Sequence, residues 1–344
     1  MQSNSKIKMN CFTPQLKGKK VLLFAPFYFC YHQKIKSELE KCGAEVHLYD
    51  ERNNPSSLKK ILIRKAKFLL KKDIFRYYES ICEKEKEFHA DFVFFVNPEA
   101  ATEECVLLLK KCFPEGVFIL YLWDSLKNKK EKTILHLFDR TYSFDPNDCE
   151  KYNMTFRPLF FLSEFQNSNP SLPEEKMKYD FCFIGTLHSN RSKILYEIMK
   201  FCDEHQLKYY YYIYIPGKLM LFLRNCVDMY LRKFSKSLVH TVPISTTEFA
   251  SISAMSRCVI DINHPKQTGL TMRTIEMLGL NKKILTTNAL ISNYDFYRPE
   301  NQIVFDQKNF RQIIDDLKKD YCAIPETIYQ KYSIAGWINE IFGA

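Results

Sequence analysis

The sequence CVIDINHPKQTGLTMRTIEMLGLNKKILTTN, from Cys258 to Asn288, holds two short apolar runs with a helical segment between them. The runs CVIDI and KILTT are typical of buried strands in a parallel sheet. A single glycine, Gly269, precedes the helical segment, and Arg273 and Glu276 lie three residues apart just inside it. The stretch therefore predicts a strand, a loop, a helix and a second strand, with polar residues gathered where the helix begins.

The same alternation of strands and helices extends along the rest of the chain. Continuous apolar runs separated by helical segments indicate a parallel sheet that helices cover on both faces. QNSNPSLPEEKMK, from Gln166 to Lys178, contains two prolines and no periodicity, which is typical of an interdomain linker. The predicted fold class is α/β, with two tandem Rossmann-like, doubly wound domains facing each other across a cleft. The predicted strands are 20–27, 44–50, 91–97, 117–124 and 140–145 before the linker, and 179–185, 207–215, 238–244, 258–262, 283–287 and 302–306 after it.

The composition of the 344 residues restricts the class of protein. No stretch approaches the roughly 18 apolar residues of a membrane-spanning helix, and the N-terminal segment lacks the apolar core of a signal peptide. The 12 cysteines are scattered without a CxxC pair, which indicates reduced thiols rather than disulfides or a zinc site. These features predict a cytoplasmic protein. The net charge of +10 predicts an anionic partner such as a nucleotide, a nucleic acid or a membrane surface.

The loop and helix start near Gly269 fit the place where open α/β sheets bind ligands, at the carboxyl ends of strands beside helix N-termini. Gly269 would let the backbone approach a ligand closely. The amide groups from Leu270 through Thr271 to Arg273 would face a pyrophosphate, and the Arg273 guanidinium adds a positive charge. Glu276, one turn later, could accept two hydrogen bonds from ribose hydroxyls. Alternatively, Arg273 and Glu276 form a surface ion pair worth a few tenths of a kcal/mol.

The segment GLTMRTIEMLGLNKKILTTN, from Gly269 to Asn288, resembles the donor-site segment of GT-B glycosyltransferases, where G-x-x-x-R-x-x-E-x-x-x-x-x-K/P-x-I/V-x-T is a familiar pattern. YDFCFIGTLHSNRSKILYEI, from Tyr179 to Ile198, is similar to the strand, glycine loop and arginine-led helix that open the C-terminal domain of these enzymes. The chain most resembles the CgeB-like and surface-polysaccharide group. The resemblance covers the C-terminal half well and the N-terminal half only by pattern.

The resemblance implies a donor-binding role for a set of residues in the C-terminal half. Glu276 would hold the donor ribose, while the first glycine loop and the arginine after it would lie near the diphosphate. Alternatively, that glycine only ends a strand, the arginine is solvated and the loop histidine is exposed. Many retaining members carry a second Glu where this chain has Thr268, which leaves the stereochemistry open and slightly favours inversion. The candidate donor-binding residues are Gly185, Thr186, Arg191, His264, Lys266, Gly269, Leu270, Thr271, Arg273 and Glu276.

The resemblance also implies the domain organisation and the reaction. Residues 1–165 would form an N-terminal acceptor domain, 166–178 the linker, 179–322 a C-terminal nucleotide-sugar domain, and 323–344 a C-terminal helix returning towards the first domain. The implied function is a glycosyltransferase of lipopolysaccharide or capsule biosynthesis. It would move a sugar from a nucleotide sugar to a surface-glycan acceptor, with a lipid-linked acceptor as one form. The alternatives are a nucleotide-sugar epimerase of the same fold and a non-enzymatic, basic nucleic-acid-binding protein.

Two residues of the first domain are candidates for the catalytic base. Asp124 ends the predicted strand 117–124, where a carboxylate could take the proton from an acceptor hydroxyl, although such an Asp is also a common helix N-cap. His32, after the first strand, is the rival base. Asp145 and Asp148 are expected to be turn and cap residues. No cluster of Asp, His or Cys has the spacing of metal ligands, so we expect neither a required metal nor a cofactor.

Two segments concentrate the positive charge. Lys59–Lys72 carries seven basic residues and no acidic one, beside an apolar stripe at helical spacing, and Lys218–Lys236 is also basic and apolar. Basic amphipathic helices suit an anionic surface, so we expect peripheral contact with the inner face of the membrane through both segments. The alternative is a core-facing helix with a solvated basic face. Nucleic-acid binding is disfavoured because the aromatic residues lie mostly inside apolar runs such as YYYYIYI and FVFFV.

Overall fold

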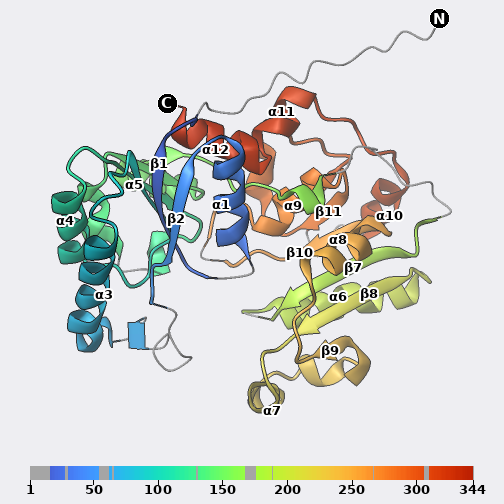
Figure 1. The fold of residues 1–344 in the computed structure, drawn as a ribbon. Coiled ribbons are helices and arrows are strands. Elements are labelled where there is room, and N and C mark those ends of the chain that lie inside the picture. Colours follow the sequence, from blue (N-terminus) through green and yellow to red (C-terminus); the bar gives the residue numbers. More distant parts are fainter. Residues whose placement is uncertain are drawn as a thin grey trace, which may run out of the picture. The chain divides into compact units, whose positions relative to one another are not determined.

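The structure is a computed structural model, which describes residues 16–27, 30–53, 62–63, 66–128, 131–166, 176–187, 189–265, 267–305 and 310–343. The chain forms two compact units (Figure 1). The first unit takes its described residues from 1–143, 148–157 and 334–344, and the second unit takes them from 144–147 and 158–333. The C-terminal helix therefore belongs to the first unit.

The first unit is built on a six-stranded sheet with the order β2-β1-β3-β4-β5-β6, in which every neighbouring pair is parallel. Because side chains alternate between the two faces, Phe95 of β3 packs on Phe24 of β1 while Phe94 packs on Trp337 of α12. Both faces are thus covered, which is why the central strands β1, β3 and β4 are almost entirely apolar. The elements are β1 Lys20–Ala25, α1 Tyr31–Lys41, β2 Glu45–Asp50, α3 Lys71–Lys84, β3 Phe92–Val96, α4 Glu103–Cys112, β4 Val117–Leu122, β5 Arg140–Ser143, α5 Pro146–Tyr152, β6 Thr155–Phe156 and α12 Ile334–Phe342.

The second unit holds another parallel six-stranded sheet, with the order β12-β11-β10-β7-β8-β9. The chain builds this sheet outward from β7 in one direction and then from β10 in the other. The direction reverses between β7 and β10, which is where open α/β sheets bind ligands. The elements are β7 Tyr179–Thr186, α6 Arg191–Glu204, β8 Tyr209–Tyr214, α7 Lys218–Val227, β9 Val239–His240, α8 Thr246–Ala254, β10 Ser256–Asp261, α9 Met272–Gly279, β11 Lys283–Thr286, β12 Gln302–Val304, α10 Phe310–Lys318 and α11 Glu326–Lys331.

The predicted α/β class with parallel sheets is confirmed, but several predicted elements differ in extent. The predicted strand 238–244 is reduced to Val239–His240, because Val242 is 67% exposed and the proline after it cannot donate to a ladder. The single C-terminal helix is instead two helices, α11 and α12. The break between them coincides with a β-bridge that pairs Ser333 with Phe161.

The basic segment Lys59–Lys72 departs from a regular α-helix at Lys67, after described residues 62–63 and 66 that are helical. Within its described part, Lys67–Leu70 is a 3₁₀ helix, and α3 begins at Lys71. A 3₁₀ helix has about three residues per turn, so the stripe expected at 3.6-residue spacing is not kept. Ile63 lies in the core, whereas Leu69 is 63% exposed. Residues 59–61 and 64–65 lie outside the described part of the chain.

The unit boundary also differs from the predicted domain boundary. Residues 158–165, expected in the first domain, group with the second unit, where the Phe165 ring packs on Phe249 at 5.5 Å between centroids. The predicted linker falls mostly on residues 167–175, which lie outside the described residues. Among the helices that the structure describes, none combines the length and the hydropathy that crossing a membrane requires.

Candidate functional site

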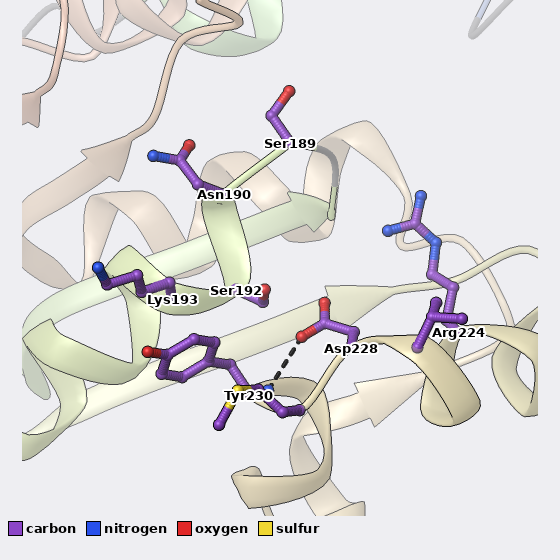
Figure 2. Close-up of a pocket in the computed structure, with 9 residues that line it drawn as sticks. Ser189, Asn190, Ser192, Lys193, Arg224, Asp228 and Tyr230 are labelled. Carbon is purple, nitrogen blue, oxygen red and sulfur yellow. Dashed lines mark hydrogen bonds between the residues drawn. The ribbon is translucent and has the colours of Figure 1, made fainter.

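A cavity of about 590 Å³ lies at the start of α6 in the second unit (Figure 2). Its walls come from the first turn of α6 and from α7 with the turn that follows it. Arg224 and Lys193 supply positive charge, and Asp228 accepts from the backbone N–H of Tyr230 at 3.0 Å. The cavity does not include the predicted donor residues. Its lining residues are Ser189, Asn190, Ser192, Lys193, Arg224, Val227, Asp228, Met229 and Tyr230.

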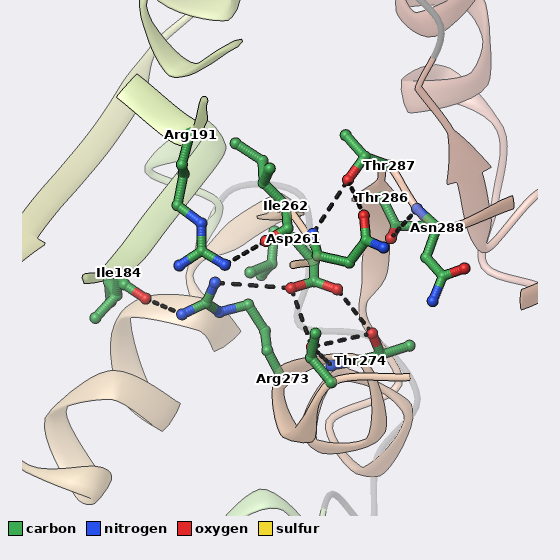
Figure 3. Close-up of polar contacts among 12 residues, drawn as sticks. Ile184, Arg191, Asp261, Ile262, Arg273, Thr274, Thr286, Thr287 and Asn288 are labelled. Carbon is green, nitrogen blue, oxygen red and sulfur yellow. Dashed lines mark hydrogen bonds and ion pairs between the residues drawn. The ribbon is translucent and has the colours of Figure 1, made fainter. Parts of the chain in front are cut away.

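Three of the predicted donor residues, Arg191, Thr271 and Arg273, instead lie around one buried carboxylate, Asp261, at the end of β10 (Figure 3). Asp261 is 1% exposed and accepts from the hydroxyls of Thr271 and Thr274, at 3.0 and 2.9 Å. The Thr271 hydroxyl in turn caps α9 by accepting from the Thr274 N–H at 3.3 Å. Asp261 therefore fixes the position of the first turn of α9 at the switch point of the sheet.

Two guanidinium groups lie beside this carboxylate (Figure 3). Arg273 donates to the carbonyl of Ile184 in β7 and lies 3.8 Å from Asp261. Arg191, the first residue of α6, donates to the carbonyl of Thr186 at 2.7 Å and to that of Ile262. Burial, together with the neighbouring Arg273, lowers the pKa of Arg191 to about 9, because both disfavour its charged form.

Gly185 is required by this packing. A Cβ added to Gly185 would lie 2.7 Å from Nη2 of Arg273, so the residue leaves space for the guanidinium. The predicted glycine of the first loop therefore does more than end a strand. It lets the guanidinium of Arg273, which belongs to α9, lie against the end of β7 and donate to the Ile184 carbonyl.

The pair of guanidiniums favours an anion. Within the described part of the chain, neither Nε of Arg191 nor Nε of Arg273 has a hydrogen-bond partner. Two cations and one carboxylate leave an excess of positive charge around two buried donors. A diphosphate suits such a site, since its oxygens accept charge-assisted hydrogen bonds from guanidinium groups.

Glu276 is 5% exposed and lies in the second turn of α9. Arg273 is also mostly buried, with a side chain 15% exposed. The surface ion pair considered from the sequence is therefore wrong for these two residues. The helix is short and lies against the sheet, so its residues from Thr274 to Gly279 are all buried.

The loop before α9 is held by contacts inside the second unit. Thr268 donates through its backbone N–H, at 3.2 Å, and through its hydroxyl to Asp145. A Cβ on Gly269 would lie 2.5 Å from the carbonyl oxygen of Phe144, so packing already accounts for this glycine. Leu270 is buried and His264 is half-buried, and Lys266 lies outside the described residues. Asp145 also accepts from the N–H of Asn147 at 3.1 Å, as a turn residue does.

The candidate bases of the first unit both follow strands of its sheet. Asp124 accepts from the side-chain amide of Asn97 at 3.1 Å. The turn after it is held by Asp148, which accepts from the N–H of Leu126 at 2.6 Å. His32, in the first turn of α1, is 7% exposed, and burial lowers its pKa, so the imidazole is neutral near pH 7. Within the described residues its Nδ1 has no hydrogen-bond partner.

A charged cluster at the end of β2 in the first unit is not among the predicted site residues. Glu51 is fully buried, accepts from the N–H of Ala100 at 2.8 Å, and has a pKa that burial raises to about 7. Arg52 lies 3.4 Å from Asp50 and 3.8 Å from Glu99. The sequence carries a signal for this cluster, since the charged run DER begins at the last residue of the predicted strand 44–50.

No protein-family model and no curated protein sequence matches the chain. Solved structures resemble it. An alpha-glucosyltransferase in complex with UDP and a mismatched 13-mer DNA gives a TM-score of 0.57 at 12% identity, covering 94% of both chains. HepE of Anabaena with UDP-glucose gives 0.58 at 8% identity, covering 93% of this chain and 98% of that one. The UDP-GlcNAc 2-epimerase of Methanocaldococcus jannaschii gives 0.51 at 11% identity, covering 91% and 98%.

At these identities the likeness concerns the fold. The similarity extends over both parallel α/β units rather than over one of them, because the coverage exceeds nine-tenths of this chain for each of these structures. The narrower resemblance to the CgeB-like group stays a prediction. The chain has the GT-B fold, which the sequence predicts from the alternation of its strands and helices and from the segment around Arg273.

Proposed function

We propose that the protein is a glycosyltransferase whose second unit binds a nucleotide-sugar donor. The observation that carries the proposal is the pair of buried guanidiniums, Arg191 and Arg273, beside Asp261 at the switch point of the sheet. Two solved structures of similar fold contain UDP or UDP-glucose, as their titles state. The two Nε donors are suited to the donor diphosphate.

The roles of the two guanidiniums follow from where negative charge develops during sugar transfer. Transfer breaks the bond between the sugar and the diphosphate, so negative charge grows on the leaving group. Preorganised cations lower the free energy of such a transition state because they are oriented before the reaction begins. Arg191 and Arg273 would stabilise the departing nucleoside diphosphate in this way, and a metal ion would not be required.

Glu276 and the acceptor side complete the proposal. The buried Glu276 carboxylate, within the same helix as Arg273, would accept hydrogen bonds from the ribose hydroxyls. A base of the first unit, Asp124 or the neutral His32, would take the proton of the acceptor hydroxyl. The acceptor that we propose is a surface glycan, lipid-linked, with the enzyme peripheral on the inner face of the membrane. In this proposal the basic residues of the chain contact anionic lipid rather than nucleic acid.

A thermal-shift panel of UDP, GDP, CMP and dTDP, alone and with their sugars, tests the donor. We expect one nucleotide to raise the unfolding temperature, and Arg273→Gln to remove that shift. Absence of a shift with all four nucleotides would contradict the proposal. Release of nucleotide that depends on an added glycan acceptor then identifies transfer.

A nucleotide-sugar epimerase is the second candidate, because one structure of similar fold is a UDP-GlcNAc 2-epimerase. The two reactions differ in their need for an acceptor. An epimerase converts the nucleotide sugar without any acceptor, and its product is still a nucleotide sugar. Nuclear magnetic resonance of the sugar nucleotide after incubation with the enzyme alone distinguishes them.

A further inference from the structure

Helix α7 presents its apolar side chains outward. Arg224, Asn225 and Asp228 lie on the half-buried face, together with Leu221, which packs against the core of the second unit. The opposite arc spans roughly 160° at 100° per residue. Its exposed fractions are 74% for Leu219, 45% for Met220, 65% for Phe222, 50% for Leu223 and 83% for Val227. None of the ten residues of α7 is buried. This is the reverse of an ordinary surface helix, which turns its apolar face to the core.

The chain after α7 is firmly attached to the same unit. Leu231 and Phe234 are buried in its core, and the rings of Tyr230 and Phe234 both pack on Tyr196 of α6. Asp228 accepts from the N–H groups of Tyr230 and Leu231, both at 3.0 Å. The apolar face is therefore held outward by a fixed flank and does not belong to a loosely packed segment.

Basic residues flank this face along the chain. From Lys218 to Lys236 there are five basic residues and one acidic residue, Asp228. Arg232 and Lys236 are exposed beyond the end of the helix, and Arg224 lines the cavity at the start of α6 (Figure 2). Val227 lines the same cavity. An apolar face with a cationic border is complementary to a bilayer whose head groups are anionic.

We propose that the outward face of α7 docks on an anionic phospholipid bilayer, with Leu219, Phe222 and Leu223 entering the interfacial region. Charge selects this occupant over a second copy of the chain, because two such faces would bring two cationic borders together. The basic segment of the first unit is a weaker candidate: Phe68 and Leu69 are exposed there, but Lys71 is paired with Glu104. The proposal deepens the proposed function, since it identifies the surface that meets the membrane.

The test is cosedimentation of the full chain with two kinds of vesicle, phosphatidylcholine alone and phosphatidylcholine containing phosphatidylglycerol. We expect binding to the anionic vesicles at low salt and release as salt is added. Phe222→Ser with Leu223→Ser should lower partitioning at least about tenfold. Arg232→Gln with Lys236→Gln should lower it about 25-fold, since each charge near an anionic surface contributes about fivefold. Leu107→Ser, at a 42% exposed position of α4, is the matched control and should bind like the parent.

UDP binding and the oligomeric state are measured on the same samples. Unchanged UDP binding by the α7 variants separates a docking defect from failure of the donor site or of folding. The proposal is overturned if the parent ignores anionic vesicles at low salt, or if the Phe222 and Leu223 variant binds them as the parent does. It is also overturned if that variant converts a dimer into a monomer while neither protein binds vesicles, which would make the face an interface between copies.

Discussion

Replacing Arg273 by glutamine is the most direct perturbation of the donor site. In the free protein this guanidinium donates to the Ile184 carbonyl and lies 3.8 Å from Asp261, while its Nε has no partner within the described residues. A hydrogen bond to a charged group is worth about 1.5–3 kcal/mol. Since about 1.4 kcal/mol corresponds to tenfold in affinity, Arg273→Gln should weaken UDP binding by roughly 10- to 150-fold.

The same change affects folding, and the assay must separate the two effects. The Ile184 carbonyl loses a buried donor, so we expect a stability loss of about 1–3 kcal/mol. Titration calorimetry with UDP gives the affinity, and thermal unfolding without ligand gives the stability. Arg257→Gln is the control, because it removes one positive charge from β10, the strand that ends at Asp261, and Arg257 pairs there with Asp180 at 3.2 Å. It should leave UDP affinity within about twofold, because this half-buried guanidinium is paired with Asp180 and lies at the opposite end of β10 from Asp261.

Gly185→Ala is a second variant for the same test, and it keeps the positive charge of Arg273. The new Cβ would meet Nη2 of Arg273 at 2.7 Å and displace the end of a flexible side chain rather than the backbone. We expect UDP affinity to fall, and the unfolding temperature to fall as well, because the displaced Nη2 is the atom that donates to the Ile184 carbonyl. If Arg273→Gln remains folded and binds UDP as the parent does, the diphosphate does not contact this guanidinium, and the donor site assigned here is wrong.

Three further predictions concern other groups. Glu276→Gln should weaken UDP binding but leave the affinity for inorganic diphosphate nearly unchanged, as measured by calorimetry; equal losses for both ligands would argue against a ribose contact. Transfer activity should survive EDTA in a coupled assay of nucleotide release, whereas a loss restored by Mg²⁺ or Mn²⁺ would contradict metal independence. Burial raises the pKa of Glu51 to about 7 from an ordinary value of 4.5, so the folded protein binds this proton more tightly than the unfolded chain does. The free energy of unfolding should therefore fall by about 3 kcal/mol as the pH rises from 4.5 to about 7. Thermal unfolding of Glu51→Gln at several pH values should lack this fall.

The sequence predicts the strands well because both sheets are parallel and covered on both faces. An apolar run marks such a strand but does not mark its end. The strand predicted over 117–124 ends at Leu122 in the structure. The apolar run in the sequence continues to Trp123, which lies beyond the last paired residue. Positions near strand ends carry the site residues, so an error of two residues matters most where function lies.

The arrangement around Asp261, which we propose as the donor site, is predicted only in part for a related reason. The spacing of Arg273 and Glu276 puts them on one helix, but no local pattern identifies Asp261 as the group that orders the others. Within CVIDI a lone aspartate is simply one residue of a strand. Its partners, Thr271 and Thr274, come from a helix that the sheet brings back beside it, and that contact is tertiary.

Helices α3 and α7 show what periodicity leaves undecided. Both have an apolar face and a polar face at helical spacing. In α3 the apolar face is covered, with Ile74, Tyr78 and Ile81 buried, whereas in α7 the polar face lies against the unit and the apolar face is exposed. Spacing defines the two faces of a helix. Which of them is buried depends on the elements that pack against that helix in the fold. An apolar face left uncovered beside basic residues is therefore a result that only the structure supplies, and it directs the search for a partner towards an anionic surface.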